Sequence, residues 1–300
     1  MSTRATVRAR REFLTVDGHE RSFLEVAPED AGARPTRLLL AVHGSNQSGR
    51  GFRRFTGGTL DHWATTGVGL TVYPDSWRGG LWNDARASTR SRARADGMDD
   101  VAFLRAIVDR YRDDGVTEVF AIGYSNGGQL LIRVVHEAPE LLRGVALVGA
   151  TLPQHDNLVP LRTDGPAVPV LLIHGTRDPL LPYRGGMASL FGFRPRGLMR
   201  SFDESVAYWV ARAGITAEPT SDLVEDVTSG ATRPARTTTT RRLYTQEGRP
   251  AVGAYSVRGG GHVVPNRVRS APWILGPSAA FDTATVLTDF FVAHRTTAPD

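Results

Sequence analysis

A serine near the middle of the chain has the surroundings of a catalytic nucleophile. The apolar run 119–123 leads into Gly-Tyr-Ser-Asn-Gly around Ser125, and apolar residues at helical spacing follow. A Gly-x-Ser-x-Gly motif needs this order of strand, sharp turn and helix to expose its serine at the carboxyl end of a sheet. The helix would also point unpaired N–H groups at a developing anion. The alternative is a glycine-rich turn that merely begins a helix, since the chain has 32 glycines.

A serine hydroxyl needs a base to take its proton, and the base needs a carboxylate to orient it. With this kind of turn, the acid and then the histidine follow the serine along the chain, each after a strand. Asp178 comes just beyond the apolar run 170–173, and His262 follows three glycines after the run 252–257. We therefore expect Asp178 and His262 to complete a triad with Ser125. The alternatives are a turn aspartate and a surface-loop histidine.

An oxyanion hole needs two N–H donors that are in place before the reaction. The backbone N–H of Asn126, directly after the serine, is the first candidate. The second should come from the loop after an early strand, and the N–H of Ser45 has that position. His43, two residues earlier, is expected to be a hydrogen-bonded structural residue rather than a catalyst.

The sequence gives no sign of a metal site or a nucleotide site. Its eight histidines include no His-x-x-x-His or Glu-x-x-His pair, and cysteine is absent. No Gly-x-Gly-x-x-Gly or Walker-type loop occurs. We therefore expect a reaction without a metal, a dinucleotide or ATP, and no other cofactor is indicated.

Strands and helices in alternation must position these residues. Alternating polar and apolar residues on both sides of Asp17-Gly18 predict an antiparallel hairpin with a type I′ turn. Continuous apolar runs predict buried strands, and apolar residues at helical spacing predict helices. The predicted strands are 12–16, 21–26, 36–42, 68–73, 119–123, 145–148, 168–173, 242–246 and 252–257, with helices beginning near 99, 126, 203 and 281. This order predicts the α/β class, with a mostly parallel twisted sheet and helices on both faces.

Composition suits a single domain over residues 1–300, because 41% hydrophobic content in 300 residues allows an ample core. Two segments differ from the rest. Residues 184–200 are rich in Gly, Arg and Pro and are expected to form a small cap over the site. Residues 219–240 are rich in Thr, Ser and Asp and are expected to be a mobile excursion rather than a linker.

The net charge of +5 comes from arginines that are scattered along the sequence. A nucleic-acid binder should gather them on one face among aromatic residues, so we expect no nucleic-acid partner, whereas acidic substrates stay open. No apolar run of 18 residues and no signal-peptide pattern occurs, so we expect no membrane association and a cytoplasmic location. The absence of cysteine fits a reducing compartment.

Six ordered blocks spread over most of the chain carry a family resemblance. They are Val42-His43-Gly44 with Gln47; Tyr73-Pro74-Asp75 with Leu81-Trp82-Asn83; Asp99-Asp100-Val101-Ala102-Phe103-Leu104; Gly123-Tyr124-Ser125-Asn126-Gly127-Gly128; His174-Gly175-Thr176-Arg177-Asp178-Pro179 with Pro182-Tyr183; and Gly259-Gly260-Gly261-His262 with Pro265. In these blocks the chain resembles the α/β-hydrolase esterases of the polyhydroxybutyrate depolymerase and feruloyl esterase type. The resemblance implies the α/β-hydrolase fold, the triad Ser125-Asp178-His262 and ester hydrolysis through an acyl-enzyme. It also implies that Trp82 and Asn83 contact substrate.

The chain departs from that family at two positions. Secreted members usually have a signal peptide and a cysteine where this chain has Ser45, which argues against secretion and action on extracellular polymer. The aromatic residue that commonly follows the catalytic histidine is replaced by Val264, which weakens the case for a flat aromatic platform.

The sequence therefore predicts a serine esterase that acts on a small or short oligomeric ester. An acyltransferase or a peptidase could use the same triad, because the sequence does not separate water, alcohol and amine acceptors. A non-catalytic binding protein with the same fold is the third possibility. The acyl group, the alcohol and the oligomeric state stay open.

Overall fold

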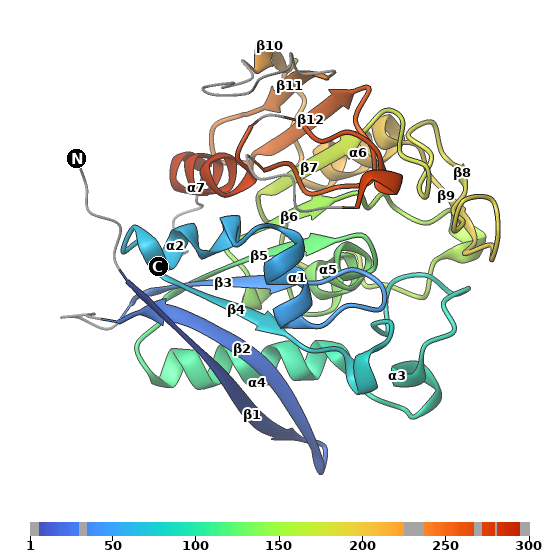
Figure 1. Ribbon diagram of the computed structural model, residues 1–300. Helices are drawn as coiled ribbons and strands as arrows, with labels where there is room; N and C mark the ends of the chain where they lie inside the picture. Colours follow the sequence, from blue (N-terminus) through green and yellow to red (C-terminus); the bar gives the residue numbers. More distant parts are fainter. Residues whose placement is uncertain (1–5, 30–34, 225–236, 267–271, 280, 295–300) are drawn as a thin grey trace.

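One large β-sheet forms the centre of the molecule. The computed structural model describes residues 6–29, 35–224, 237–266, 272–279 and 281–294. Within these residues a ten-stranded sheet has the order β1-β2-β4-β3-β5-β6-β7-β12-β11-β10 (Figure 1). The strands are β1 (Val7–Val16), β2 (His19–Pro28), β3 (Arg37–Val42), β4 (Leu70–Pro74), β5 (Glu118–Tyr124), β6 (Gly144–Val148), β7 (Val170–Gly175), β10 (Thr220–Val224), β11 (Thr238–Tyr244) and β12 (Val252–Arg258).

The middle of the sheet is parallel, and both of its edges are antiparallel. Strands β4, β3, β5, β6, β7 and β12 pair in parallel. Strands β1 and β2 add an antiparallel hairpin at one edge, and β11 and β10 add antiparallel strands at the other. The carboxyl ends of the six parallel strands therefore share one edge of the sheet, which is where such folds bind ligands.

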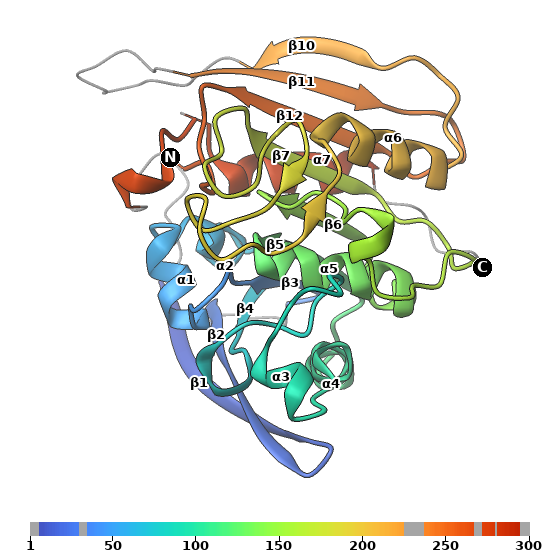
Figure 2. The ribbon, with the colours of Figure 1, turned by 90° about the vertical axis from the view of Figure 1, so that its right-hand side faces the viewer.

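Helices cover both faces of this sheet (Figures 1 and 2). Leu38 and Leu40 of β3 pack in a core with α4, α5 and α6, whereas Leu39 and Ala41 pack in a second core with α1, α2 and α7. Because both faces are buried, the strand reads as a continuous apolar run. The helices are α1 (Gly49–Phe55), α2 (His62–Thr65), α3 (Arg92–Ala95), α4 (Asp100–Asp113), α5 (Asn126–Glu137), α6 (Phe202–Arg212) and α7 (Thr283–His294), with short 3-10 turns at η1 (Thr59–Asp61), η2 (Trp77–Gly79), η3 (Pro139–Leu141), η4 (His155–Asn157) and η5 (Trp273–Leu275). The predicted α/β architecture is confirmed.

The N-terminal hairpin turns where the sequence predicts it. Asp17 and Gly18 both have positive φ, 50° and 77°, as a type I′ turn requires. The register pairs Val16 with His19 and continues to Val7 with Pro28. The hairpin is therefore longer than the predicted strands 12–16 and 21–26.

The opposite edge of the sheet differs from the prediction for residues 219–240. Residues 220–224 form β10 and residues 238–240 begin β11, and the two strands pair antiparallel. The predicted excursion is therefore too long at both ends, and residues 225–236 lie outside the described part. The error has a physical reason: the residues of β10 are mostly exposed, so no buried face imposes an apolar alternation on its sequence.

Residues 184–200 connect β7 and its following loop to α6, and Figure 2 shows them as a long loop that carries β8 (Gly186–Met187) and β9 (Leu198–Met199). The two short strands pair antiparallel. Backbone bonds fasten the segment to its neighbours, from Ser189 N–H to the Leu180 carbonyl and from Gln154 N–H to the Leu198 carbonyl, both 3.0 Å.

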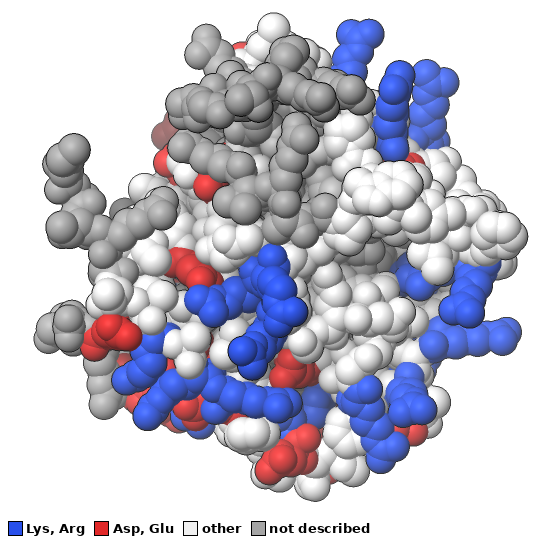
Figure 3. All heavy atoms as spheres, in the orientation of Figure 1, with Lys and Arg blue, Asp and Glu red and all other residues white. Residues whose placement is uncertain are grey.

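The basic side chains do not form one continuous patch on the face in Figure 3, where they lie in separate groups and acidic side chains lie among those in the lower half. None of the helices in the described part of the chain is both long enough and apolar enough to cross a bilayer.

Candidate active site

Ser125 lies at the turn from β5 into α5. Its φ of 52° and ψ of −116° are unusual for a residue with a side chain. The turn is tight because Gly127 lies against the end of β3, where an added Cβ would be 2.3 Å from the Val42 carbonyl oxygen. The Ser125 N–H donates to the Val148 carbonyl at 2.8 Å, which ties the turn to β6. Strand, turn and helix thus hold the hydroxyl at the carboxyl end of the parallel strands.

Asp178 and His262 come together beside this turn. The Nδ1 atom of His262 lies 2.5 Å from Oδ2 of Asp178, and both side chains are buried. The other oxygen of Asp178 accepts the N–H groups of Leu180 and Leu181, each at 2.8 Å. Burial alone would raise the pKa of Asp178, but the charge and hydrogen bond of His262, together with His174, lower it on balance. The carboxylate is therefore held ionised.

The second ring nitrogen of His262 has no hydrogen-bond partner in the described part of the chain. Since Nδ1 donates to a carboxylate, Nε2 is the basic nitrogen, and no hydrogen-bond partner for it occurs among the described residues. The backbone fixes the ring from behind, because the His262 N–H donates to the Leu275 carbonyl and the Tyr124 hydroxyl donates to the His262 carbonyl, each at 2.7 Å. This is the state in which a histidine can accept a proton from a neighbouring hydroxyl.

Ser125 and His262 line the same cavity, which has a volume of about 270 Å³. Its walls come from the loop after β3, the serine turn, the loop after β7, residues 188–196 and the 3-10 turn η5. The lining residues are Ser45, Asn46, Gln47, Phe55, Arg86, Tyr124, Ser125, Gln129, Gly149, Leu180, Leu181, Ala188, Ser189, Leu190, Arg196, His262, Pro272 and Leu275. Three of these five segments directly follow the parallel strands β3, β5 and β7.

The two predicted oxyanion donors lie at this cavity or directly beside it. Asn126 is the first residue of α5, so its backbone N–H has no carbonyl partner within the helix. Its side chain is held on both sides, because Oδ1 accepts the Trp82 N–H at 2.8 Å and Nδ2 donates to Asp84. Ser45 lines the cavity, whereas the N–H of the next residue, Asn46, is engaged by the Gly80 carbonyl. Their role as an oxyanion hole stays a prediction.

His43 supports the loop that carries Ser45. Its Nδ1 donates to the Gly44 carbonyl at 2.7 Å, and its Nε2 accepts the Ser76 N–H at 3.1 Å. Burial lowers its pKa from 6.5 to about 4, although the Gly44 carbonyl and Asp75 act in the opposite direction. The histidine is therefore neutral and fully bonded, as a structural residue should be.

Trp82 and Asn83 are not among the residues that line the cavity, and their predicted contact with substrate stays a prediction. Trp82 is 0% exposed and its indole N–H donates to the His43 carbonyl at 2.9 Å. The side chain of Asn83 is occupied by Arg94 and by the Met98 carbonyl. The N–H of Trp82 fastens the loop between β4 and α4 to Asn126 at the serine turn, whereas the N–H of Asn83 fastens it to Asp100 of α4. The sequence block gave their place in the chain but not the direction of their side chains.

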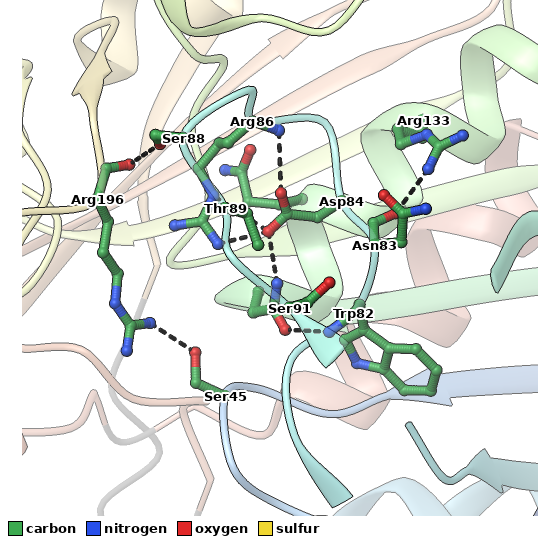
Figure 4. A network of polar contacts seen from close by, with 12 residues as sticks. Ser45, Trp82, Asn83, Asp84, Arg86, Ser88, Thr89, Ser91, Arg133 and Arg196 are labelled. Atoms are coloured by element: carbon green, nitrogen blue, oxygen red, sulfur yellow. Dashed lines mark hydrogen bonds and ion pairs between the residues drawn. The ribbon is translucent and has the colours of Figure 1, made fainter. Parts of the chain in front are cut away.

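Two arginines and a glycine that line the cavity were not predicted from the sequence as site residues. Arg86 forms a buried ion pair with Asp84, and Arg196 donates to Ser45 Oγ at 2.8 Å (Figure 4). Gly149, at the end of β6, lies under the ring of His262. No local signal marks either arginine, because the chain has 36 basic residues and many of them are in loops.

In the described part of the chain, no three His, Asp or Glu side chains are arranged to hold a metal ion. The site can supply the Ser125 hydroxyl at the cavity, the His262 imidazole, whose Nε2 has no partner among the described residues, and the buried Asp178 carboxylate to which that imidazole is bonded. Such an arrangement suits acyl transfer to a serine.

Comparisons with known proteins find esterases and carboxylesterases among the similar proteins. A protein-family model described as Phospholipase/Carboxylesterase matches residues 67–190, a stretch that contains Ser125 and Asp178 but not His262. A curated protein of Nocardia uniformis subsp. tsuyamanensis, "Putative esterase NocK", is 35% identical over 187 residues, which is 60% of this chain. The chain spans about half the length of that relative, 51%.

Solved structures with the same fold are distant in sequence. An acetyl xylan esterase from Aspergillus awamori has a TM-score of 0.56 at 14% identity, covering 86% of this chain and 95% of its own. The native form of a protein abbreviated pOPH has a TM-score of 0.50 at 13% identity, covering 68% of this chain and 75% of its own. Together with the family model, these matches confirm the predicted α/β-hydrolase fold.

Proposed function

We propose that the chain is a serine hydrolase that cleaves carboxylic esters through an acyl-enzyme. Ser125 is the nucleophile, His262 the general base and acid, and Asp178 the residue that orients the imidazole. One observation carries the proposal: His262 donates through Nδ1 to Asp178, its Nε2 has no partner among the described residues, and His262 lines the same cavity as Ser125. The names of the sequence relative and of the family model, an esterase and a carboxylesterase, support the same reaction.

In the first half of the reaction, the Ser125 hydroxyl attacks the ester carbonyl and His262 Nε2 takes its proton. The carbonyl oxygen gains the negative charge, which the N–H groups of Asn126 and Ser45 stabilise. The bond from the carbonyl carbon to the alcohol oxygen then breaks, and the protonated His262 gives its proton to the leaving alcohol. The lowered pKa of Asp178 keeps this carboxylate ionised, so it stabilises the imidazolium that forms.

In the second half, a water molecule replaces the alcohol. His262 takes a proton from the water as its oxygen attacks the acyl-enzyme, and the same proton then returns to Ser125 Oγ when the acid leaves. The products are one carboxylic acid and one alcohol, and the enzyme is unchanged.

Within this reaction we propose a polyhydroxybutyrate depolymerase-like or feruloyl esterase-like substrate range, limited to small or short oligomeric esters. The sequence blocks support the type, and the cavity of about 270 Å³ supports the limit, because it lies just below the usual range for small-molecule pockets. Phe55 and Tyr124 supply the aromatic part of the cavity wall.

The test is a panel of p-nitrophenyl esters from acetate to octanoate, with methyl ferulate, on the wild type, Ser125→Ala and Ser221→Ala. Ser221 lies in β10 at the edge of the sheet and serves as the matched control. We expect Ser125→Ala to lose on the order of 10⁴-fold or more in kcat, and Ser221→Ala to keep full activity. A wild type that cleaves no ester, or a Ser125→Ala variant that keeps its rate, would overturn the proposal.

A further inference from the structure

The walls of the cavity carry positive charge only. Among the lining residues in the described part of the chain, the charged side chains are Arg86 and Arg196, and no Asp or Glu is present. Arg86 is neutralised by Asp84, with which it forms an ion pair buried from solvent. Arg196 has no such partner, because no carboxylate of the described residues lies within 4.0 Å of its guanidinium. Of the two guanidinium groups at the cavity, Arg86 therefore has a carboxylate partner and Arg196 has none among the described residues.

The position of Arg196 is fixed before any ligand arrives. Its backbone N–H donates to the Ala188 carbonyl at 2.7 Å, and its carbonyl accepts the Ser88 hydroxyl at 2.7 Å. Figure 4 shows the side chain reaching from this anchored backbone to Ser45, whose Oγ accepts one of its N–H groups. A guanidinium has five N–H donors, so a single neutral acceptor leaves most of its donor capacity unused.

The surroundings of Arg196 favour an incoming anion. The side chain is half-buried, and burial, together with the nearby charge of Arg86, lowers its pKa, whereas Asp84 acts in the opposite direction. A partly desolvated cation near a second cation is stabilised when an anion binds beside it, because the anion offsets the lost hydration and the repulsion between the two cations. Carboxylates suit this position best, because two parallel N–H donors of a guanidinium match the two oxygens of a carboxylate.

We propose that Arg196 makes the enzyme selective for esters that bear a free carboxylate close to the scissile bond. This inference rests on the proposed esterase function and adds the class of its substrate. Two chemical classes satisfy it: hemiesters, in which the carboxylate belongs to the acyl part, and acylated hydroxy acids, in which it belongs to the alcohol part. Arg196 donates to the hydroxyl of Ser45, whose backbone N–H is a predicted oxyanion donor, so the carboxylate would bind on the side of the cavity where segment 184–200 meets the loop after β3.

A purely structural role for Arg196 makes different predictions. If its only task is to hold Ser45, then Ser45→Ala should have the same effect as loss of the guanidinium, and neutral and anionic esters should suffer equally. Arg194 supplies the control for general damage to the segment, since it is an exposed arginine two residues away.

The experiment compares two matched substrate pairs by pH-stat: monomethyl adipate with dimethyl adipate for the acyl side, and 4-acetoxybenzoate with its methyl ester for the alcohol side. We expect the wild type to prefer the anionic member of one pair in kcat/KM. Arg196→Met should lower kcat/KM for that anionic ester about 10- to 100-fold and change the rate for its neutral partner less than about threefold. Ser45→Ala and Arg194→Met should keep the preference, and added salt should weaken it.

Three results would overturn the inference. If the wild type cleaves both members of each pair equally well, the selectivity is absent although the esterase function stands. If Arg196→Met and Ser45→Ala lower both members of a pair by the same factor, Arg196 only positions the loop. If the wild type cleaves neither these esters nor the p-nitrophenyl panel, the esterase function fails and the inference fails with it.

Discussion

The imidazole of His262 rests on a residue that has no side chain. Gly149 has a positive φ of 56°, and an added Cβ would lie 2.9 Å from Cε1 and 3.0 Å from Nδ1 of the ring. On the other sides the ring is held by Asp178 and by the backbone contacts of its own loop. The direction in which Nε2 points therefore depends on the absence of a methyl group at residue 149.

A Gly149→Ala substitution should displace the imidazole and lower kcat at least about tenfold, because misplacing a catalytic group by an ångström is costly. Gly67→Ala is the matched control: Gly67 also has positive φ, 72°, but has no atom within 4 Å of an added Cβ. Both variants place an alanine at positive φ, and only Gly149→Ala should lose activity toward p-nitrophenyl acetate. Equal activities of the two variants would contradict this account of the ring's position.

At the level of single residues, the sequence identifies candidate catalytic residues when the reaction requires them to follow one another in a fixed order along the chain. Ser125, Asp178 and His262 could each be picked out because a turn motif, a strand end or a glycine run precedes them. Their catalytic roles stay predictions. Arg196 could not be picked out, because its importance comes from a contact with Ser45, 151 positions away. The inward direction of Trp82 was likewise decided by tertiary packing.

At the scale of elements, a buried ion pair joins the N-terminal hairpin to α4. Arg21 of β2 donates to Asp100 of α4 at 2.7 Å, and the two side chains are 3% and 0% exposed. The second oxygen of Asp100 accepts the Asn83 N–H at 2.7 Å, which also fastens the loop after β4. A second pair, Arg110 with Glu12 at 3.3 Å, joins α4 to β1 at the surface.

Arg21→Ala should lower the free energy of unfolding by about 3–5 kcal/mol, because it leaves the buried Asp100 carboxylate without its cation. Arg110→Ala should cost less than about 1 kcal/mol, since solvent screens the exposed pair. Urea unfolding of both variants against the wild type measures the difference. Losses of equal size would show that burial does not control the strength of these two contacts.

Most elements could be predicted because their local signals agree with their environment. The hairpin follows from Asp17-Gly18, and α4 follows from Asp99, whose carboxylate caps the helix through the N–H groups of Val101 and Ala102. Helix α6 begins at Phe202, one position before the predicted start near 203, and a capping box between Ser201 and Glu204 marks that start. Strand β10 could not be predicted, because an exposed edge strand has no apolar face that would show in its sequence.

At the scale of the whole molecule, several buried histidines link stability to pH. His43, His136 and His174 are buried, and burial lowers the pKa of each below 6.5, to about 4 for His43. In the unfolded chain these histidines take up protons near pH 6.5, whereas in the folded protein they stay neutral to lower pH. The unfolded state therefore binds more protons between these values, and stability falls as the pH falls.

For His43 alone, a shift from pH 6.5 to pH 5 should lower the free energy of unfolding by about 2 kcal/mol, at 1.36 kcal/mol per pH unit. Urea unfolding at pH 7.5 and pH 5 measures the loss for the wild type and for His43→Asn, which keeps a donor and an acceptor but does not titrate. The variant should show a smaller loss of stability on acidification. The same loss in both proteins would mean that His43 is not the buried neutral group described above.

The arrangement of the sheet could be predicted only in part. A mostly parallel sheet follows from the alternation of strands and helices, and it places the loops after β5, β7 and β12 at one edge. The order in which the strands lie does not follow, because β4 inserts between β2 and β3 and β12 lies beside β7 through contacts between distant parts of the chain. The position of residues 188–196 beside the cavity depends on the same long-range packing, and the role of segment 184–200 as a cap stays a prediction.

The most direct test of the central claim is to locate a covalent adduct. We would treat the wild type, Ser125→Ala and His262→Asn with a fluorophosphonate and identify the modified residue by mass spectrometry of peptides. The account predicts a single adduct on Ser125, none at that position in Ser125→Ala, and much slower labelling of His262→Asn, because Nε2 no longer activates the hydroxyl. An adduct on another residue of the wild type, or no adduct at all, would contradict the assignment of Ser125 as an activated nucleophile.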